Sequence, residues 1–373
     1  MRRILLAPDS FKGSITAREF CRIGAQVIQR HWPDIQVIQR PLSDGGEGFV
    51  EAMLESGQAT CHVVNSLDPL GRPIKAAFAW QADNHTAIIE MAQASGLPLL
   101  SKHERDPMQA GTLGTGLVIK AAIELGARRI ILGLGGSATN DGGAGALQAL
   151  GIQLLDQQNQ PIKPGAQGLM QLARIGEIPQ NLLDIEWQLA CDVSNPLLGE
   201  NGATAIYGPQ KGVTAQTHPK LEQALAQFAH LIDQKTGHNI TTRPGAGAAG
   251  GMAGGFMGLL NAQTHSGFAL LANSIGLNQT FEQGVDLVIT GEGRMDAQTR
   301  QGKLPMKLAE LAQTYQVPIL GICGQLDIRA EQAPEFIGLF SLVNRLTDEA
   351  DAMQQTETWL ADTIYSALNL YLH

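Results

Sequence analysis

The sequence predicts an α/β fold with two domains: a doubly wound parallel-sheet domain, and a mixed α/β domain inserted into it. Three observations lead to this prediction. Apolar runs alternate with amphipathic segments at both ends of the chain, as in parallel sheets covered by helices. The middle of the chain instead has successive apolar runs without helices between them. The length of 373 residues also suits two cores better than one. The first domain is therefore expected to be Rossmann-like or flavodoxin-like.

The first sixty residues predict two strand–helix pairs. Apolar runs at 3–7 and 35–38 are the expected strands. Thr16 and Glu19 have the spacing of a capping box, and apolar residues then recur at helical intervals. A second helix is expected at 49–54.

The middle of the chain predicts a mixed region. Strands are expected at 61–64, 74–80, 86–91, 129–132, 152–155 and 187–192, and helices at 113–125 and 221–232. The segment 244–281 has no charged residue, but glycine, alanine and polar residues interrupt it. A membrane span needs about 20 apolar residues, so we expect this segment to be buried chain.

The last ninety residues return to the first pattern. Strands are expected at 285–290, 317–323 and 337–343, and helices at 307–312 and 356–372. The parallel-sheet domain is therefore expected to combine 1–60 with 285–373, and the inserted domain to cover 61–284. The segment 105–150 could belong to either.

Composition and net charge argue against several classes of function. The net charge of −9 argues against binding to nucleic acid or to anionic membranes. The four cysteines lie far apart, which argues against a disulfide framework or a zinc site and fits a cytoplasmic protein. The expected partner is therefore a small-molecule substrate. The chain is expected to be either a monomer or a homodimer.

Five polar loops are the candidate functional segments, because open α/β sheets bind ligands at the carboxyl ends of their strands. The first, 9–14, contains Ser10 and Lys12, a hydroxyl and a cation suited to an anionic group. The second, 43–48, contains Asp44 and Glu47 on either side of two glycines, which suits a metal ligand or a general base.

The third loop, 133–145, is rich in glycine and suits an anion cradle made of backbone amides. Its first residues, Gly133 to Ala138, also match the dinucleotide fingerprint G-x-G-x-x-A, with Asp156 at a suitable distance to bind a ribose. An NAD-dependent oxidoreductase is therefore an alternative. The polar residues at 140–143 count against it, because the helix should begin inside the fingerprint.

The fourth and fifth loops combine carboxylates with cations. Asp192 ends an apolar run, and Lys211 follows between glycines. Glu292, Arg294 and Asp296 lie together after another run. Carboxylates for Mg²⁺ and cations for the transferred charge are what phosphoryl transfer requires. The sequence has neither a P-loop nor the protein-kinase motifs.

Together the loops resemble the bacterial glycerate kinase family of the glycerate 2-kinase type. The matching blocks follow one another along the chain at 7–13, 43–48, 68–72, 135–145, 190–193, 195–199, 208–212 and 289–294. The resemblance implies ATP-dependent phosphorylation of D-glycerate with Mg²⁺, usually to 2-phosphoglycerate, with 3-phosphoglycerate as the alternative product. It also implies a two-domain α/β fold with the site in a cleft.

The chemistry of the loops suggests a role for each residue, which the resemblance alone does not assign. Phosphates of ATP, or their metal, are expected at Gly135, Gly136, Ser137, Asn140 and Asp141, and Mg²⁺ at Glu292 and Asp296. Asp44 or Asp192 is expected to be the base, with Lys12 and Arg294 neutralising the transferred phosphoryl group. Lys211 or Arg72 is expected to pair with the substrate carboxylate, and Ser10 to contact the substrate. A non-catalytic sensor of small acids is a further alternative.

Overall fold

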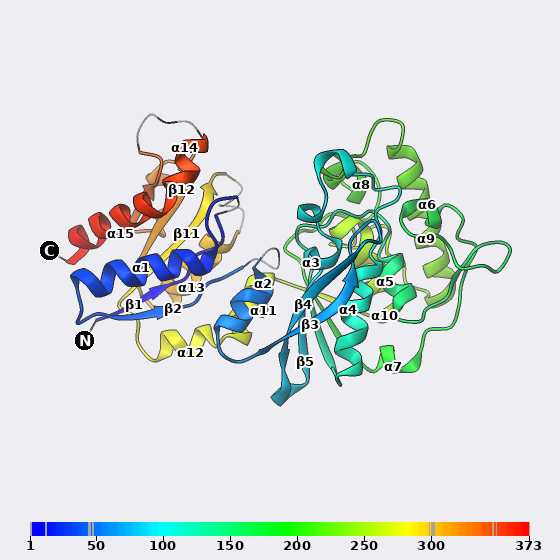
Figure 1. Ribbon diagram of the computed structural model, residues 1–373, viewed down its shortest axis with the longest axis horizontal. Coiled ribbons are helices and arrows are strands. Elements are labelled where there is room, and N and C mark those ends of the chain that lie inside the picture. Colours follow the sequence, from blue (N-terminus) through cyan, green and yellow to red (C-terminus); the bar gives the residue numbers. More distant parts are fainter. Residues whose placement is uncertain are drawn as a thin grey trace. The chain divides into compact units, whose positions relative to one another are not determined.

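The computed structural model describes residues 2–11, 13–43, 46, 48–297, 299, 303–344, 347 and 349–372. The chain forms two compact units (Figure 1). The first comprises Met1–Asp44, Glu51–Ser56 and Phe268–His373, and the second comprises Gly45–Val50 and Gly57–Gly267. The segment 105–150 lies in the second unit, and the first unit takes in 268–284. We propose that these units are the two domains of the protein.

The first unit is built on a parallel sheet of five strands in the order β13-β12-β11-β1-β2. The strands are β1 (Arg3–Leu6), β2 (Gln36–Gln39), β11 (Leu287–Met295), β12 (Ile319–Leu326) and β13 (Gly338–Ser341). In chain order this is the flavodoxin-like arrangement 2-1-3-4-5, in which the direction of winding reverses between β1 and β11. The predicted fold class is confirmed.

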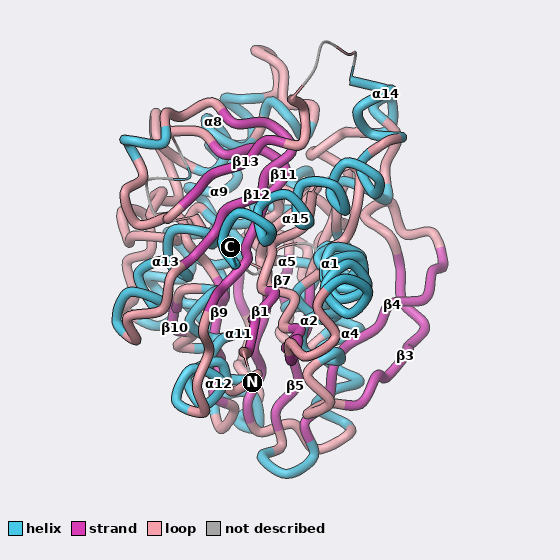
Figure 2. Tube along the Cα trace, turned by 90° about the vertical axis from the view of Figure 1, so that its left-hand side faces the viewer, coloured by secondary structure: helices cyan, strands magenta, loops and turns pink. Residues whose placement is uncertain are grey.

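Helices cover both faces of this sheet. They are α1 (Ala17–His31), α2 (Phe49–Glu55), α11 (Gly267–Ser274), α12 (Leu277–Glu282), α13 (Leu304–Thr314), α14 (Glu349–Gln354) and α15 (Thr356–Leu372). Figure 2 shows α1 and α15 on one side of the sheet and α13 on the other. The predicted capping box begins α1: the Glu19 amide donates to Thr16 Oγ1 at 3.1 Å, and the Thr16 amide donates to the Glu19 carboxylate at 2.8 Å.

The second unit is built on a mixed sheet of six strands in the order β10-β9-β6-β5-β4-β3. The strands are β3 (Thr60–Leu67), β4 (Pro73–Gln81), β5 (Thr86–Glu90), β6 (Arg129–Gly133), β9 (Glu186–Ala190) and β10 (Gln263–His265). The first three are antiparallel, whereas β5, β6, β9 and β10 run parallel. The mixed region predicted from the sequence is confirmed.

The predicted strand at 152–155 is shorter than expected. Only β7 (Leu154–Leu155) forms, and it pairs with β8 (Arg174–Ile175) in a separate two-stranded sheet. The longer helices of this unit are α4 (Leu113–Glu124), α5 (Ala144–Ala149), α8 (Ala203–Tyr207), α9 (His218–Thr236) and α10 (Met252–Leu260). Short helical turns are α3 (Ala92–Ser95), α6 (Ala166–Leu169), α7 (Gln180–Leu183), η1 (Ala82–Asn84), η2 (Leu97–Leu99), η3 (Lys102–Glu104), η4 (Pro209–Lys211) and η5 (Ala248–Gly251), with η7 (Ala330–Gln332) in the first unit.

Within the uncharged segment, residues 245–260 are buried and packed backbone to backbone, as predicted, whereas β10 (Gln263–His265) is exposed. The amide of Gly142 donates to the carbonyl of Gly250 at 3.0 Å. A Cβ on Gly250 would lie 2.0 Å from the carbonyl oxygen of Thr139, and one on Gly255 would lie 2.2 Å from that of Gly142. These glycines therefore allow η5 and α10 to press against the loop that follows β6. None of the helices that the structure describes is long and apolar enough to cross a membrane.

Replacing Gly250 should destabilise the second unit strongly. Gly250→Ala adds a Cβ against backbone at a residue with φ +64°, whereas Gly237 has φ +75° and open space around it. We expect Gly237→Ala to cost about 1 kcal/mol from backbone strain alone, and Gly250→Ala about 2–4 kcal/mol because overpacking adds to the strain. Urea unfolding of the two variants measures the difference. Equal losses would contradict the packing described here.

Candidate active site

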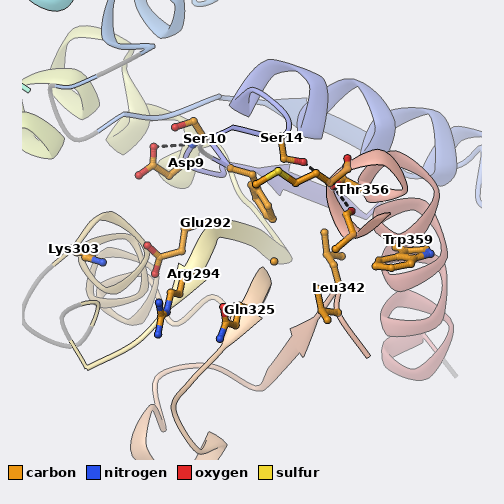
Figure 3. Close-up of a pocket in the computed structure, with 16 residues that line it drawn as sticks. Asp9, Ser10, Ser14, Glu292, Arg294, Lys303, Gln325, Leu342, Thr356 and Trp359 are labelled. Atoms are coloured by element: carbon orange, nitrogen blue, oxygen red, sulfur yellow. Dashed lines mark hydrogen bonds between the residues drawn. The ribbon is translucent and has the colours of Figure 1, made fainter. Parts of the chain in front are cut away.

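A pocket of about 430 Å³ lies at the carboxyl ends of the strands of the first unit. It lies where the direction of winding reverses between β1 and β11, which is where open α/β sheets usually bind ligands. Its two ends differ in polarity, as Figure 3 shows. The polar end is lined by Asp9, Ser10, Glu292, Arg294 and Lys303, and Leu342 and Trp359 line the apolar end, beside the Ser14 and Thr356 hydroxyls. The other apolar lining residues are Phe11, Val343, Ala352 and Met353.

Two carboxylates come from adjacent strands at the polar end. Glu292 lies on β11, is only 6% exposed, and accepts a hydrogen bond from Thr299 Oγ1 at 2.6 Å. Asp9 follows β1, and its amide donates to the carbonyl of Gly291 at 2.8 Å, which fixes this loop beside β11. The hydroxyl of Ser10 is buried and has no partner among the described residues. A buried hydroxyl of this kind usually has a partner, so it indicates a ligand position.

Of the three predicted residues in the fifth loop, two line the pocket and one does not. Glu292 and Arg294 line the pocket, and Arg294 forms an ion pair of 2.6 Å with Asp327. Asp296 is not among the lining residues. Its carboxylate accepts the amide of Thr299 at 3.2 Å and lies 3.5 Å from the Lys303 amine. Asp296 thus contacts groups that border the pocket without lining it.

A second cluster lies in the second unit, on the loop between β6 and α5. The loop begins after Gly133 and reaches its helix only at Ala144. No acceptor for the amides of residues 135, 136, 137, 139 and 140 is found among the hydrogen bonds of the described residues. Thr139 Oγ1 and Asn140 Oδ1 are also buried without a partner in that part of the chain. Ser137, Thr139 and Asn140 are buried, whereas Gly135 is half-buried and Gly136 is exposed. Buried amides are nearly always paired, so the unpaired amides of the three buried residues make the loop suited to an anion.

The dinucleotide-binding alternative loses its structural basis here. Its fingerprint requires a helix that begins inside the motif, but α5 begins at Ala144, beyond Ala138. Asp156 does not lie at the end of a neighbouring strand of the main sheet. It lies in the β7–β8 hairpin, where its carboxylate accepts the amides of Gln158 and Gln160 at 2.9 Å each.

Asp141 holds this loop from within the protein. It is fully buried, and its carboxylate accepts hydrogen bonds from Thr112 Oγ1 at 2.8 Å and from three backbone amides. Those amides belong to Thr112, Gly143 and Gly145, at 2.9, 3.1 and 3.3 Å. Burial raises the pKa of Asp141, and these hydrogen bonds oppose that rise. The carboxylate therefore joins the first turns of α4 and α5.

Lys211 reaches the same loop from η4. Its side chain is 1% exposed, and its amine donates to Ser137 Oγ and to the carbonyl of Thr139 at 2.8 Å each. Burial lowers the pKa of Lys211 to about 7, and Asp141 acts in the opposite direction. The two predicted residues Ser137 and Lys211 are thus brought together.

Arg72 is engaged by carboxylates of its own unit. Its guanidinium pairs with Asp68 in the β3–β4 turn and with Glu104 at 2.5 Å. The amide of Ser101, followed by Arg72, lowers the pKa of Glu104 to about 2. Arg72 therefore fastens η3 to the turn between β3 and β4.

Asp192 and Glu90 lie at the same sheet edge as the glycine-rich loop. Glu90, Gly133 and Ala190 are aligned in register across β5, β6 and β9, and Asp192 follows β9 directly. Asp192 is exposed, whereas Glu90 is only 5% exposed. Sequence reasoning missed Glu90, although a carboxylate that ends an apolar strand was the available signal. It assigned no role to Asp9, although Asp9 opens the first candidate loop and follows β1.

Two predicted catalytic residues, Lys12 and Asp44, lie outside the described residues, as do Glu47 and Gln298. Among the residues that the structure does describe, no group of three or more His, Cys, Asp or Glu side chains could hold a metal ion by itself.

The fold and these two clusters define an α/β protein with polar groups gathered at the carboxyl ends of its strands. The chain matches the glycerate kinase family over residues 4–372. A protein of Halalkalibacterium halodurans named glycerate kinase is 41% identical over 364 residues, which cover 96% of this chain and 96% of the relative.

A protein of Escherichia coli strain K12 named glycerate 2-kinase is 41% identical over 326 residues, which cover 87% of this chain and 85% of the relative. A crystal structure from Salmonella typhimurium LT2, described as a candidate glycerate kinase 2, matches with a TM-score of 0.87 at 38% identity and covers 99% of this chain and 98% of that one. The chain belongs to the glycerate kinase family, and it is a kinase.

The buried amine of Lys211 should make stability depend on pH. Its pKa is lowered to about 7 in the folded protein, against 10.5 for an ordinary lysine. The unfolded chain therefore binds more protons between these pH values, and stability should rise with pH across this window. Relative to Lys211→Met, the native free energy of unfolding should increase by up to about 1.4 kcal/mol per pH unit. Urea unfolding at several pH values measures this slope, and parallel pH profiles for the two proteins would contradict it.

Proposed function

We propose that this protein transfers the γ-phosphoryl group of ATP to D-glycerate and forms 2-phosphoglycerate. The observation that carries the proposal is the 41% identity to the Escherichia coli protein named glycerate 2-kinase, over 87% of this chain. The four cysteines are free thiols, which supports a reducing cytoplasm as the place of the reaction.

The glycine-rich loop of the second unit is our proposed phosphate-binding segment. The amides of Gly135, Gly136, Ser137 and Asn140 have no acceptor among the described residues, and Lys211 adds positive charge behind them. Aligned amides of this kind bind anions. Because both oxygens of Asp141 accept hydrogen bonds from the protein, we assign Asp141 to positioning the loop and not to contacting ATP.

The polar end of the pocket fits a magnesium ion that arrives with ATP. Mg²⁺ is usually held by one or two carboxylates together with substrate phosphates and water, and Glu292 and Asp9 supply such a pair. A bound Mg²⁺ would withdraw charge from the phosphate oxygens. We assign Asp296, predicted from the sequence as a second ligand, to positioning Thr299 and Lys303.

The remaining roles follow from charge. Arg294 borders the pocket, and with Lys12 we propose that it balances the charge of the transferred phosphoryl group. Asp192 or Asp44 would accept the proton of the glycerate hydroxyl. Arg72 is paired with two carboxylates, so we assign it to holding η3, and we keep Ser10 as a contact for the substrate.

The function is tested by mixing the protein with Mg-ATP and D-glycerate and following phosphoenolpyruvate in the presence of enolase. We expect a signal with enolase alone, because enolase acts on 2-phosphoglycerate. A signal that also requires phosphoglycerate mutase would instead identify 3-phosphoglycerate as the product. Folded protein that gives no signal under either condition would overturn the proposal.

Glu292 and Asp296 should differ sharply in their effect on activity. Glu292→Gln removes a carboxylate that lines the pocket, whereas Asp296→Asn alters only a supporting contact. We expect the first to lower kcat/KM on the order of 10²-fold and to raise the Mg²⁺ concentration needed for half-maximal rate. The second should lower kcat/KM by less than about tenfold with an unchanged Mg²⁺ requirement. Equal losses of kcat/KM and equal Mg²⁺ requirements in the two variants would identify Asp296 as a metal ligand.

A further inference from the structure

The apolar end of the pocket in the first unit has no role in the chemistry described so far. We propose that it binds the adenine base of ATP; the inference rests on the proposed function. Adenine is the flat and largely apolar part of ATP, whereas the triphosphate of ATP and the second substrate, glycerate, are anionic. A pocket of about 430 Å³ is within the usual range for small-molecule sites.

The apolar wall has exposed side chains where a base could cover them. Met353 on α14 is 43% exposed, and Val343 after β13 is 39% exposed. Behind them Leu342 and Trp359 are buried, at 2% and 6% exposure. Large apolar side chains that are exposed together on a concave surface indicate a ligand or partner. Figure 3 shows Leu342 and Trp359 at the end of the pocket away from Asp9 and Glu292.

The order of chemical groups along the pocket matches the order within a nucleotide. The apolar wall comes from β13, α14 and α15, and the carboxylates that suit a metal-bound phosphate lie at β1 and β11. Gln325 lies between the two ends in Figure 3. Its Nε2 donates to Asp327 at 2.9 Å, which fixes the orientation of the amide, and its Oε1 is an acceptor suited to an amino group such as the one on adenine.

The glycine-rich loop of the second unit is a poorer candidate for the base. It offers backbone amides, the buried Thr139 hydroxyl and the Lys211 amine, together with the side-chain oxygen of Asn140. The amides, the hydroxyl and the amine are hydrogen-bond donors, which suit a negatively charged group. A base needs apolar surface on its faces, which the pocket in the first unit provides.

Charge substitutions at Met353 separate a base from a phosphate at this wall. If the base binds here, Met353→Glu and Met353→Lys should each raise the KM for ATP by about tenfold, because either charge loses its water against the ring. The KM for glycerate should change less than about twofold. A phosphate at this wall would instead give opposite effects, with Lys tightening and Glu weakening ATP binding, and would overturn the inference.

The matched controls are Met170→Glu and Met170→Lys. Met170 is 44% exposed, almost the same as Met353, and it belongs to the second unit and is not among the lining residues of this pocket. Both controls should leave the KM for ATP unchanged. An unchanged KM for ATP in the Met353 variants would overturn the inference even if the protein phosphorylates glycerate normally.

Photolabelling tests the location without any turnover. 8-Azido-ATP should label peptides that contain residues 339–359, and adenosine should protect them better than inorganic triphosphate. Labelling confined to peptides from 134–143 or 190–212 would overturn the inference. Correct labelling without phosphorylation of glycerate would instead contradict the proposed function and leave the base site standing.

Discussion

The buried carboxylate of Asp141 is the interaction on which the second unit's candidate site depends. Placing a carboxylate away from water is costly unless hydrogen bonds replace its hydration. Here the amides of Thr112, Gly143 and Gly145 and the Thr112 hydroxyl supply them. Two of these amides belong to the first turn of α5 or its cap, and Thr112 is the cap of α4. One side chain thus fixes the N-termini of both helices and the end of the glycine-rich loop that precedes α5.

Glycines determine how close the rest of the chain comes to this loop. A side chain on Gly250 or Gly255 would overlap the backbone of Thr139 or Gly142. This close packing buries residues 137–140. Several of their amides have no acceptor in the described part of the chain. Unpaired buried amides destabilise a fold. An anion bound as we propose would offset that cost, so the packing of α10 favours an anion site at this loop.

Local patterns were sufficient to predict much of the fold, whereas the site depends on register. The Thr16–Glu19 capping box and the parallel sheet follow from residues close in sequence. Glu90 was missed, and Asp9 was given no role within its candidate loop, because their significance comes from distant partners, the aligned Gly133 and the carbonyl of Gly291. Asp141 was predicted to contact ATP phosphates or their metal, and its burial could not be predicted because it depends on the amide and hydroxyl of Thr112, 29 residues earlier in the chain.

The distribution of charge explains why a kinase can lack a P-loop. A P-loop supplies amides and a lysine from one short segment. In the phosphate site that we propose, the amides come from 135–140, and Lys211, 72 residues after Thr139, donates to the Thr139 carbonyl in the same loop. Because Lys211 is buried and its pKa is near 7, its charge depends on what the loop holds. If the loop binds a phosphate, as we propose, the anion favours the protonated amine of Lys211.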